Sequence, residues 1–236
     1  MRILFEFVKG ARLRFVSLLD MQRLMQRALR RSGLPIRYSG GYSPHAAMSF
    51  ASALGIGVWS TCEILDVKME SECPLQEAFE RMNAALPADM RITRVSAVAD
   101  GHPASMARLS WADYEIIFEP AQARIATDAL ELLAQAEIMA MRKTKSGEKE
   151  TDVRPLIATL AAQTLADGRA VLRARLRLCE QGTLKPELLI QLAAARHGVE
   201  YNTGDAEIIR RALLTGDDAS TARPIITDGV LATYPG

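Results

Sequence analysis

The sequence predicts an α+β fold of two tandem ferredoxin-like βαββαβ units with antiparallel sheets. Two observations predict it. Strand-like and helix-like periodicities follow one another as strand, helix, strands, helix, strand over residues 2–98, and the same order recurs over 111–214. The turn-forming stretch Asp100-Gly-His-Pro103 separates them. The expected division is a first unit at 1–100, a second unit at 101–215 and a loosely held C-terminal tail at 216–236.

The first unit should hold one long helix over residues 17–33. Ser17 is a suitable N-cap, Asp20 places a carboxylate in the first turn, and Gly33 with Pro35 ends the helix. Apolar residues at three- and four-residue spacing predict its buried face: Leu18, Met21, Leu24, Met25, Ala28 and Leu29. The other expected elements are strands at 2–8, 13–16, 35–39, 46–53, 61–69 and 90–98, and a helix at 74–86.

The second unit repeats this order of elements. A charged stretch at 143–152 (KTKSGEKETD) is expected to be a solvent loop, and Asp167-Gly168 signals a hairpin turn. The expected elements are strands at 111–119, 138–142, 169–178 and 207–214, helices at 121–135 and 186–197, and a strand or short helix at 157–165.

The composition is typical of a globular protein, with 49% hydrophobic and 24% charged residues. The three cysteines, Cys62, Cys73 and Cys179, are widely spaced and form no CxxC pair, which favours free thiols in a reducing cytoplasm. No cysteine triplet is present that would hold an iron–sulfur cluster, and no apolar run is long enough to span a membrane. We therefore expect a cytoplasmic protein without a metal or cofactor of its own.

The net charge of +1 conceals an excess of positive charge at the start of the chain. Residues 1–50 contain nine arginines and lysines but only two acidic residues, Glu6 and Asp20. Within the helix expected at 17–33, four arginines share one stripe: Arg23, Arg27, Arg30 and Arg31. A solvated helix face usually mixes charges of both signs, and like charges at i,i+4 spacing cost a helix roughly 0.2–0.5 kcal/mol per pair. The stripe therefore indicates an anionic partner, unless acidic residues elsewhere in the chain neutralise it.

A glycine-containing loop at 38–45 follows this helix and is a candidate binding loop. Its two adjacent glycines permit unusual backbone angles or a tight turn, and its other side chains offer hydroxyls, aromatic rings and an imidazole. It matches no phosphate-loop pattern. The candidate ligand- or RNA-binding residues are Arg14, Arg23, Arg27, Arg30, Arg31, Tyr38, Ser39, Gly40, Gly41, Tyr42, Ser43 and His45.

Two further features leave alternatives open. Arg173, Arg175 and Arg177 alternate with apolar residues, so they form either a secondary basic face or a solvent face paired with acids on neighbouring strands. His45 is the candidate acid or base for catalysis, but it also suits ligand contact or fixing of the loop. The other histidines, His102 and His197, occupy turn and helix-end positions and are expected to be structural.

Several motifs resemble one bacterial family. In the first half they are RFVSLLD at 14–20, ALRRSGLP at 28–35, YSGGYSPH at 38–45 and SFA at 49–51, and in the second half DVRP at 152–155 and GTLKP at 182–186. The chain resembles an uncharacterised family encoded beside, or fused to, a radical S-adenosylmethionine protein. The resemblance implies such a protein as partner and implies no activity.

These observations favour an RNA-binding accessory protein that works with a radical S-adenosylmethionine enzyme. One alternative is a metal-independent endoribonuclease that uses His45, since tandem ferredoxin-like units with a basic helix are also similar in architecture to CRISPR repeat-processing endoribonucleases. Another is a protein–protein adaptor whose arginine face binds an acidic partner. Against catalysis, the sequence shows no second acid or base beside His45.

Overall fold

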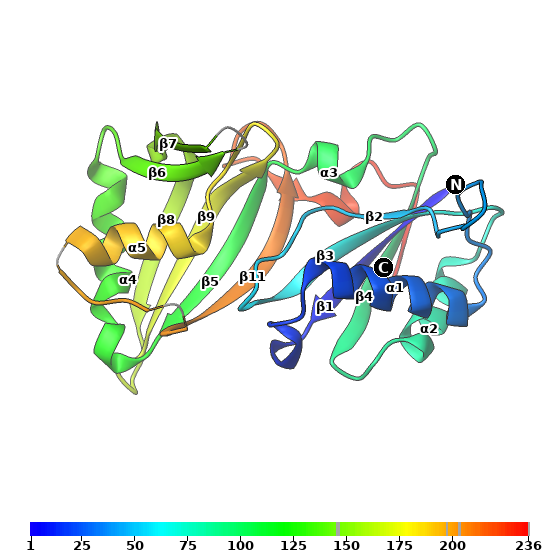
Figure 1. The fold of residues 1–236 in the computed structure, drawn as a ribbon, viewed down its shortest axis with the longest axis horizontal. Helices are drawn as coiled ribbons and strands as arrows, with labels where there is room; N and C mark the ends of the chain where they lie inside the picture. The colour runs from blue at the N-terminus through cyan, green and yellow to red at the C-terminus, as the bar shows by residue number, and fades with distance from the viewer. Residues whose placement is uncertain (145–146, 197, 203, 236) are drawn as a thin grey trace. The chain divides into compact units, whose positions relative to one another are not determined.

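The structure is a computed structural model, which describes residues 1–144, 147–196, 198–202 and 204–235. His197 lies outside the described residues. The chain forms two compact units (Figure 1). The first contains residues 1–109 and 212–236, and the second contains residues 110–211.

The prediction of two tandem ferredoxin-like units with antiparallel sheets is wrong. The described strands form an eleven-stranded mixed sheet that includes a parallel pair, with a main path in the order β10-β9-β5-β11-β3-β1-β4-β13. A separate two-stranded sheet contains β6 and β7. Hydrophobic periodicity reports the type and order of elements, whereas the neighbours of each strand are decided by tertiary packing, which the sequence pattern does not contain.

Three strands form the centre of the first unit. β1 (Arg2–Lys9) pairs antiparallel with both β3 (Val58–Lys68) and β4 (Met90–Val98). The short strand β2 (Met48–Phe50) adds to β3. Two short strands were expected on either side of the 38–45 loop. The strand expected at 46–53 is only three residues long, as β2. The segment 35–39 forms isolated bridges at Ile36 and Tyr38 in place of a strand.

Two helices cover one face of these strands. α1 (Leu18–Ser32) and α2 (Leu75–Ala85) lie beside each other, as Figure 1 shows. The helical predictions for this unit are confirmed, including the N-cap Ser17, whose hydroxyl accepts a hydrogen bond from the Asp20 N–H at 3.2 Å, and the left-handed C-cap Gly33. The strand expected at 13–16 is absent from the described structure, where η1 (Ala11–Leu13) precedes α1.

The core of the first unit lies between these helices and the sheet. From β1 the side chains of Ile3, Phe5 and Phe7 enter it, and they meet the apolar stripe of α1. Met21, Met25, Ala28 and Leu29 of that stripe are buried, as predicted, whereas Leu18 is exposed and Leu24 is only partly buried. Burying a large apolar side chain contributes about 1.5–3 kcal/mol, so this stripe fixes which face of α1 points outward.

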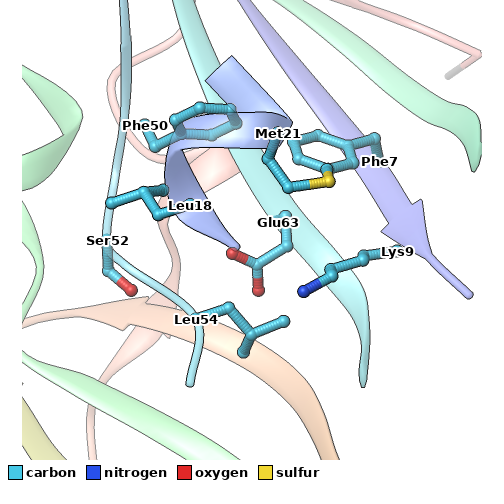
Figure 2. Close-up of a pocket in the computed structure, with 8 residues that line it drawn as sticks. All are labelled: Phe7, Lys9, Leu18, Met21, Phe50, Ser52, Leu54 and Glu63. Atoms are coloured by element: carbon cyan, nitrogen blue, oxygen red, sulfur yellow. The ribbon is translucent and has the colours of Figure 1, made fainter. Parts of the chain in front are cut away.

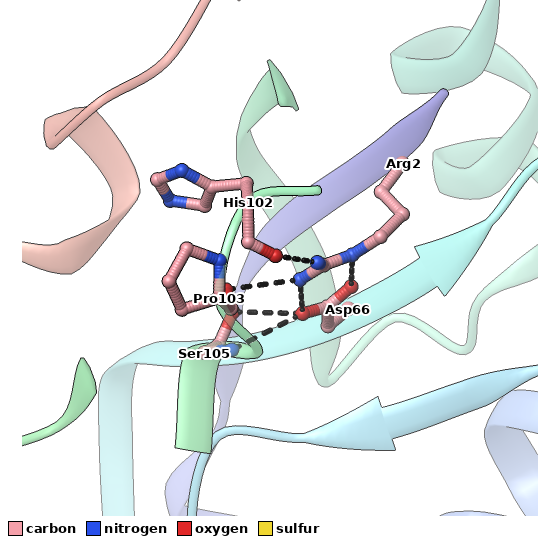
Figure 3. Close-up of polar contacts among 5 residues, drawn as sticks. All are labelled: Arg2, Asp66, His102, Pro103 and Ser105. Atoms are coloured by element: carbon pink, nitrogen blue, oxygen red, sulfur yellow. Dashed lines mark hydrogen bonds and ion pairs between the residues drawn. The ribbon is translucent and has the colours of Figure 1, made fainter. Parts of the chain in front are cut away.

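The other face of the first unit carries a buried polar network (Figure 3). Arg2 and Asp66 form an ion pair, and Asp66 also accepts hydrogen bonds from the Ser105 backbone N–H at 3.2 Å and hydroxyl at 3.1 Å. Arg2 donates to the carbonyl oxygens of His102 and Pro103. Residues 102–105, at the start of α3 (Ser105–Arg108), are therefore fixed to β1 and β3.

The second unit contains β5 (Trp111–Phe118), β8 (Ile157–Thr164), β9 (Ala170–Cys179) and β10 (Gly182–Thr183). β9 pairs antiparallel with β5, β8 and β10, and Asp167-Gly168 forms the predicted turn between β8 and β9. α5 (Pro186–Arg196) confirms a predicted helix. The helix predicted at 121–135 is instead divided into η2 (Pro120–Gln122), α4 (Arg124–Asp128) and η3 (Ala129–Ala134).

The charged stretch at 143–152 is not simply a solvent loop. β6 (Met139–Thr144) and β7 (Gly147–Asp152) pair antiparallel, so most of the stretch belongs to a hairpin. The carboxylate of Asp152 accepts hydrogen bonds from the backbone of Ile138 and Arg154, each at 2.9 Å, and η4 (Arg154–Leu156) follows. The sequence did not predict β7, because its residues are charged or polar and neither of its faces carries the apolar alternation that indicates a strand.

β11 (Ala206–Thr215) contributes residues to both units, and the C-terminal segment then belongs to the first. This segment holds β12 (Arg223–Pro224), η5 (Ile225–Thr227) and β13 (Ala232–Tyr234), and β13 pairs with β4. Ile225 and Ile226 are buried. The Tyr234 ring packs edge-on against Phe79, with 5.4 Å between ring centroids. Residues 216–235 are therefore a packed part of the first unit, in contrast to the loosely held tail that the sequence suggests, and Gly236 lies outside the described residues.

Candidate functional site

The outer face of α1 carries the predicted arginine stripe. Because the apolar stripe of α1 is buried, the opposite side of the helix faces solvent. Arg23, Arg27, Arg30 and Arg31 are all exposed, and the Arg23 side chain retains 61% of its accessible surface. These positions span two to three turns of one helix, so their guanidinium groups follow one another along its axis.

Few of these charges are neutralised. Arg23 contacts the Asp20 carboxylate at 3.3 Å, but both side chains are exposed, and such pairs contribute little. Arg31 donates to the carbonyl oxygen of Ala85 at 2.7 Å, near the C-terminal end of α2. Among the described residues, Arg27 and Arg30 have no acidic partner within ion-pair distance. The segment 63–80, a potential source of balancing acids, therefore does not neutralise the stripe.

Arg14 lies before the N-terminal end of α1 and is only partly exposed. Its guanidinium group stacks over the Phe15 ring, with 4.8 Å between the guanidinium carbon and the ring centroid, and it donates to the Ala11 carbonyl oxygen at 3.4 Å. The Phe15 side chain is largely exposed. An arginine held on an exposed aromatic ring presents both a cation and an apolar surface.

The loop at 38–45 is held at its base and open at its tip. The Ser39 N–H donates to the His45 carbonyl oxygen at 2.8 Å, and the His45 N–H donates to the Ser39 hydroxyl at 3.0 Å. A bridge between Tyr38 and Ala46 continues this pairing. The loop is thus a small, closed hairpin that follows the C-terminal end of α1 in the chain (Figure 1).

The tip of this loop is exposed. Tyr42 is fully exposed and Tyr38 is partly so. A Cβ atom at Gly40 or Gly41 would meet no atom within 4 Å, and Gly41 has φ of 109°, which favours glycine. The backbone angle therefore favours glycine at position 41. At both positions there is room for a larger side chain. The His45 side chain is exposed and has no hydrogen-bond partner among the described residues; its backbone N–H and carbonyl oxygen make the contacts with Ser39.

The arginines of β9 are balanced by acidic residues on the neighbouring strand. Arg175 makes two hydrogen bonds with the Asp113 carboxylate, at 2.7 and 2.8 Å, and these raise the pKa of Arg175. Arg173 approaches Glu115 at 3.7 Å. Arg177 stacks over Trp111 at 4.7 Å. This face of the second unit lines a cavity of about 340 Å³, and its charges are largely paired with acidic residues, whereas Arg27 and Arg30 of α1 have no acidic partner among the described residues.

A buried charged pocket in the first unit was not predicted from the sequence (Figure 2). Lys9, at the end of β1, and Glu63, in β3, are only 2% and 3% exposed. Both side chains point into a pocket that is otherwise mainly apolar, lined by Phe7, Leu18, Met21, Phe50, Ser52 and Leu54. The sequence did contain a signal, because Lys9 and Glu63 each belong to a predominantly apolar strand. Charged residues are seldom fully buried unless they are paired.

Within the described part of the chain, no group of three or more histidine, cysteine, aspartate or glutamate side chains is arranged to hold a metal ion. No described helix is both long and apolar enough to cross a bilayer.

One family model matches residues 2–186, and its description is "Uncharacterized protein conserved in bacteria (DUF2344)". No curated protein matches the chain.

Proposed function

The chain belongs to this bacterial family, and we propose that it is an RNA-binding accessory protein whose contact surface is the outer face of α1 together with the 38–45 loop. One observation carries the proposal. Arg23, Arg27 and Arg30 are exposed along one helix face, and Arg27 and Arg30 have no acidic partner among the described residues. An unbalanced row of cations is unfavourable in isolation and becomes favourable beside a polyanion.

The residue types fit a nucleic-acid backbone. A guanidinium group is planar, remains charged and donates in a fork that matches phosphate oxygens. α1 contains 15 residues, which gives it a length of about 22 Å, enough to follow several consecutive phosphates.

The nearby aromatic residues favour single-stranded RNA over a duplex. Tyr42 and Tyr38 are exposed in the loop after α1, and Phe15 is exposed just before it. Unpaired bases stack on such rings, at about 1–3 kcal/mol per base, whereas a duplex keeps its bases stacked inside. The proposed ligand is therefore a strand whose phosphates follow the arginines and whose bases reach the aromatic side chains.

The accessory role is the part of the proposal that rests on sequence. The motifs at 14–20, 28–35 and 38–45 resemble those of proteins encoded beside a radical S-adenosylmethionine protein. They coincide with the N-terminal part of α1, its C-terminal end and the following loop. We infer that such an enzyme is the partner and that this chain presents RNA to it.

Crosslinking in cells tests the proposal. After ultraviolet irradiation, RNA bound to the full-length protein is digested, and peptides that carry nucleotide remnants are identified by mass spectrometry. The crosslinks are expected within residues 14–45. Crosslinks confined to the second unit would contradict the proposed surface. Recovery of an iron–sulfur protein with no crosslinked RNA would instead support an adaptor that binds an acidic protein.

A further inference from the structure

The pocket formed by Lys9 and Glu63 has no role in the phosphate contacts proposed above. Its two charged side chains come from adjacent antiparallel strands, and Figure 2 shows them pointing toward one another below Leu18. The Lys9 ammonium group donates to the Val16 carbonyl oxygen at 3.0 Å, just before the N-cap of α1. The pocket therefore lies beneath the first turn of the helix that carries the arginine stripe.

Burial of these charges is costly for the fold. Removing a carboxylate and an ammonium group from water costs several kcal/mol each, and apolar residues of similar size often serve stability as well or better. Each group also has hydrogen-bonding capacity for more than one partner. An ammonium group has three N–H donors, and a carboxylate has about four acceptor positions. The bond to the Val16 carbonyl oxygen uses one of the three donors of Lys9.

The shape of the pocket limits what can enter. Its volume is about 20 Å³, enough for a group the size of a water molecule but too small for a whole ring. Phe7, Met21 and Phe50 form apolar walls. Leu18 lines the pocket while remaining 38% exposed, so it lies where the pocket meets solvent. A suitable ligand presents a small polar edge to the charged pair and an apolar, flat body to Leu18 and Leu54.

We propose that this pocket binds the hydrogen-bonding edge of one unpaired nucleobase of the bound strand. The edge of a base places an acceptor beside a donor, which complements the Lys9 ammonium and the Glu63 carboxylate respectively. The ring then packs against Leu18 and Leu54. The proposal rests on the proposed function, and it assigns base recognition to the N-terminal end of α1 while the arginines bind phosphate.

Two neighbouring leucines allow a matched test. Leu18→Trp places a bulky side chain at the opening of the pocket without changing the charged pair. Leu19→Trp makes the same change one residue later, at a position that is 54% exposed and does not line the pocket. The probes are a labelled single-stranded RNA dodecamer and a dodecamer of the same backbone with every base removed. Binding of both probes is measured by fluorescence anisotropy for the wild-type protein and both variants.

The Leu18→Trp protein should lose about tenfold in affinity for the RNA and show no change for the abasic strand. The Leu19→Trp protein should bind both probes as the wild type does. Equal affinities of the two variants for the RNA would overturn the pocket assignment and leave the arginine surface intact. Failure of the wild-type protein to bind either probe would reject the proposed function itself.

A second substitution tests the chemistry of the pair. Glu63→Gln keeps the shape of the side chain but replaces an acceptor oxygen with an amide donor. Provided that thermal unfolding shows a folded protein, the order of preference among oligo(A), oligo(C), oligo(G) and oligo(U) should change from that of the wild type. An unchanged order would show that Glu63 does not face the base. If the Glu63→Gln protein does not fold, the comparison of Leu18→Trp with Leu19→Trp decides whether the pocket binds a base.

Discussion

At the scale of single residues, the first unit depends on polar groups buried on the side of the sheet opposite α1. Asp66 accepts hydrogen bonds from Arg2 and from both polar groups of Ser105, so its carboxylate connects β1, β3 and the start of α3. Arg2 in turn binds the backbone of residues 102 and 103. Such a network is favourable only when every member is satisfied, which makes it sensitive to the loss of one charge.

Asp66→Asn should therefore strongly destabilise the protein. The substitution leaves Arg2 buried without its counter-charge, which costs about 3–5 kcal/mol in the free energy of unfolding. Urea denaturation measures this change. Asp100→Asn is the matched control, because Asp100 is exposed and pairs with the N-terminal amino group at 2.9 Å, and its loss should have a much smaller effect. Similar losses for both variants would contradict a structural role for the network.

His102 should make stability depend on pH. Burial, followed by the nearby Arg108 and Arg2, lowers the pKa of His102 below its ordinary value of 6.5, while Asp228 and Asp66 oppose the shift. The folded state therefore favours neutral His102. Its contribution to stability is complete above pH 6.5 and is lost as the pH falls through the unfolded value toward the lowered folded one.

Between pH 7.5 and pH 5, the wild-type protein should thus lose more stability than His102→Gln, which has no titrating group at this position. Urea denaturation at both pH values, under identical salt, checks the difference. A variant that loses as much stability as the wild type on acidification would show that His102 does not contribute.

At the scale of elements, the boundaries of α1 were predictable because they depend on local chemistry. At the N-terminal end, the Ser17 hydroxyl accepts a hydrogen bond from the backbone N–H of Asp20, three residues later. At the C-terminal end, Gly33 adopts the left-handed conformation, with φ of 65°. β7 was not predictable in this way. Its residues are mostly exposed and largely charged, and it forms because it pairs with β6, a contact that its own sequence does not indicate.

Ser17→Ala should lower the free energy of unfolding by about 1 kcal/mol, because the Asp20 N–H then loses its acceptor. The exposed Ser71, before α2, provides the control, and Ser71→Ala should change stability by no more than about 0.5 kcal/mol. The measurement is urea denaturation of both proteins. If the two variants were equally stable, Ser17 would not be acting as a cap.

The C-terminal segment should also contribute to stability through Gly229. This residue has φ of +63°, and a Cβ atom there would lie 2.7 Å from the His102 ring. Gly229→Ala should destabilise the protein by at least about 1–2 kcal/mol, from the backbone conformation alone. Gly101→Ala, where an added Cβ atom meets nothing within 4 Å, should be nearly neutral. A neutral Gly229→Ala would mean that the segment does not pack on His102.

At the scale of the whole molecule, the sequence predicted what the elements are but not how they combine. The arginine stripe could be read from residues 23–31 because helical spacing alone defines it. The Lys9–Glu63 pocket could not, because its two charges are far apart in the chain and meet only through the register of β1 and β3. The eleven-stranded sheet was missed for the same reason, since β11 becomes a neighbour of β5 and β3 only through tertiary packing.

The dependence of RNA affinity on salt tests most directly whether the arginine face of α1 binds RNA. Dissociation constants for a single-stranded RNA are measured from low to high salt for three proteins. They are the wild type, Arg23→Glu/Arg27→Glu/Arg30→Glu, and the control Arg124→Glu/Arg169→Glu/Arg196→Glu, which makes the same charge change at exposed arginines that have acidic partners.

Each phosphate contact adds about −0.7 to the slope of log affinity against log salt for a single strand. The α1 variant should therefore bind more weakly and show a slope flatter by about 2, while the control retains the wild-type slope. Equal slopes for the α1 variant and the control would contradict the claim that α1 forms the RNA-binding surface.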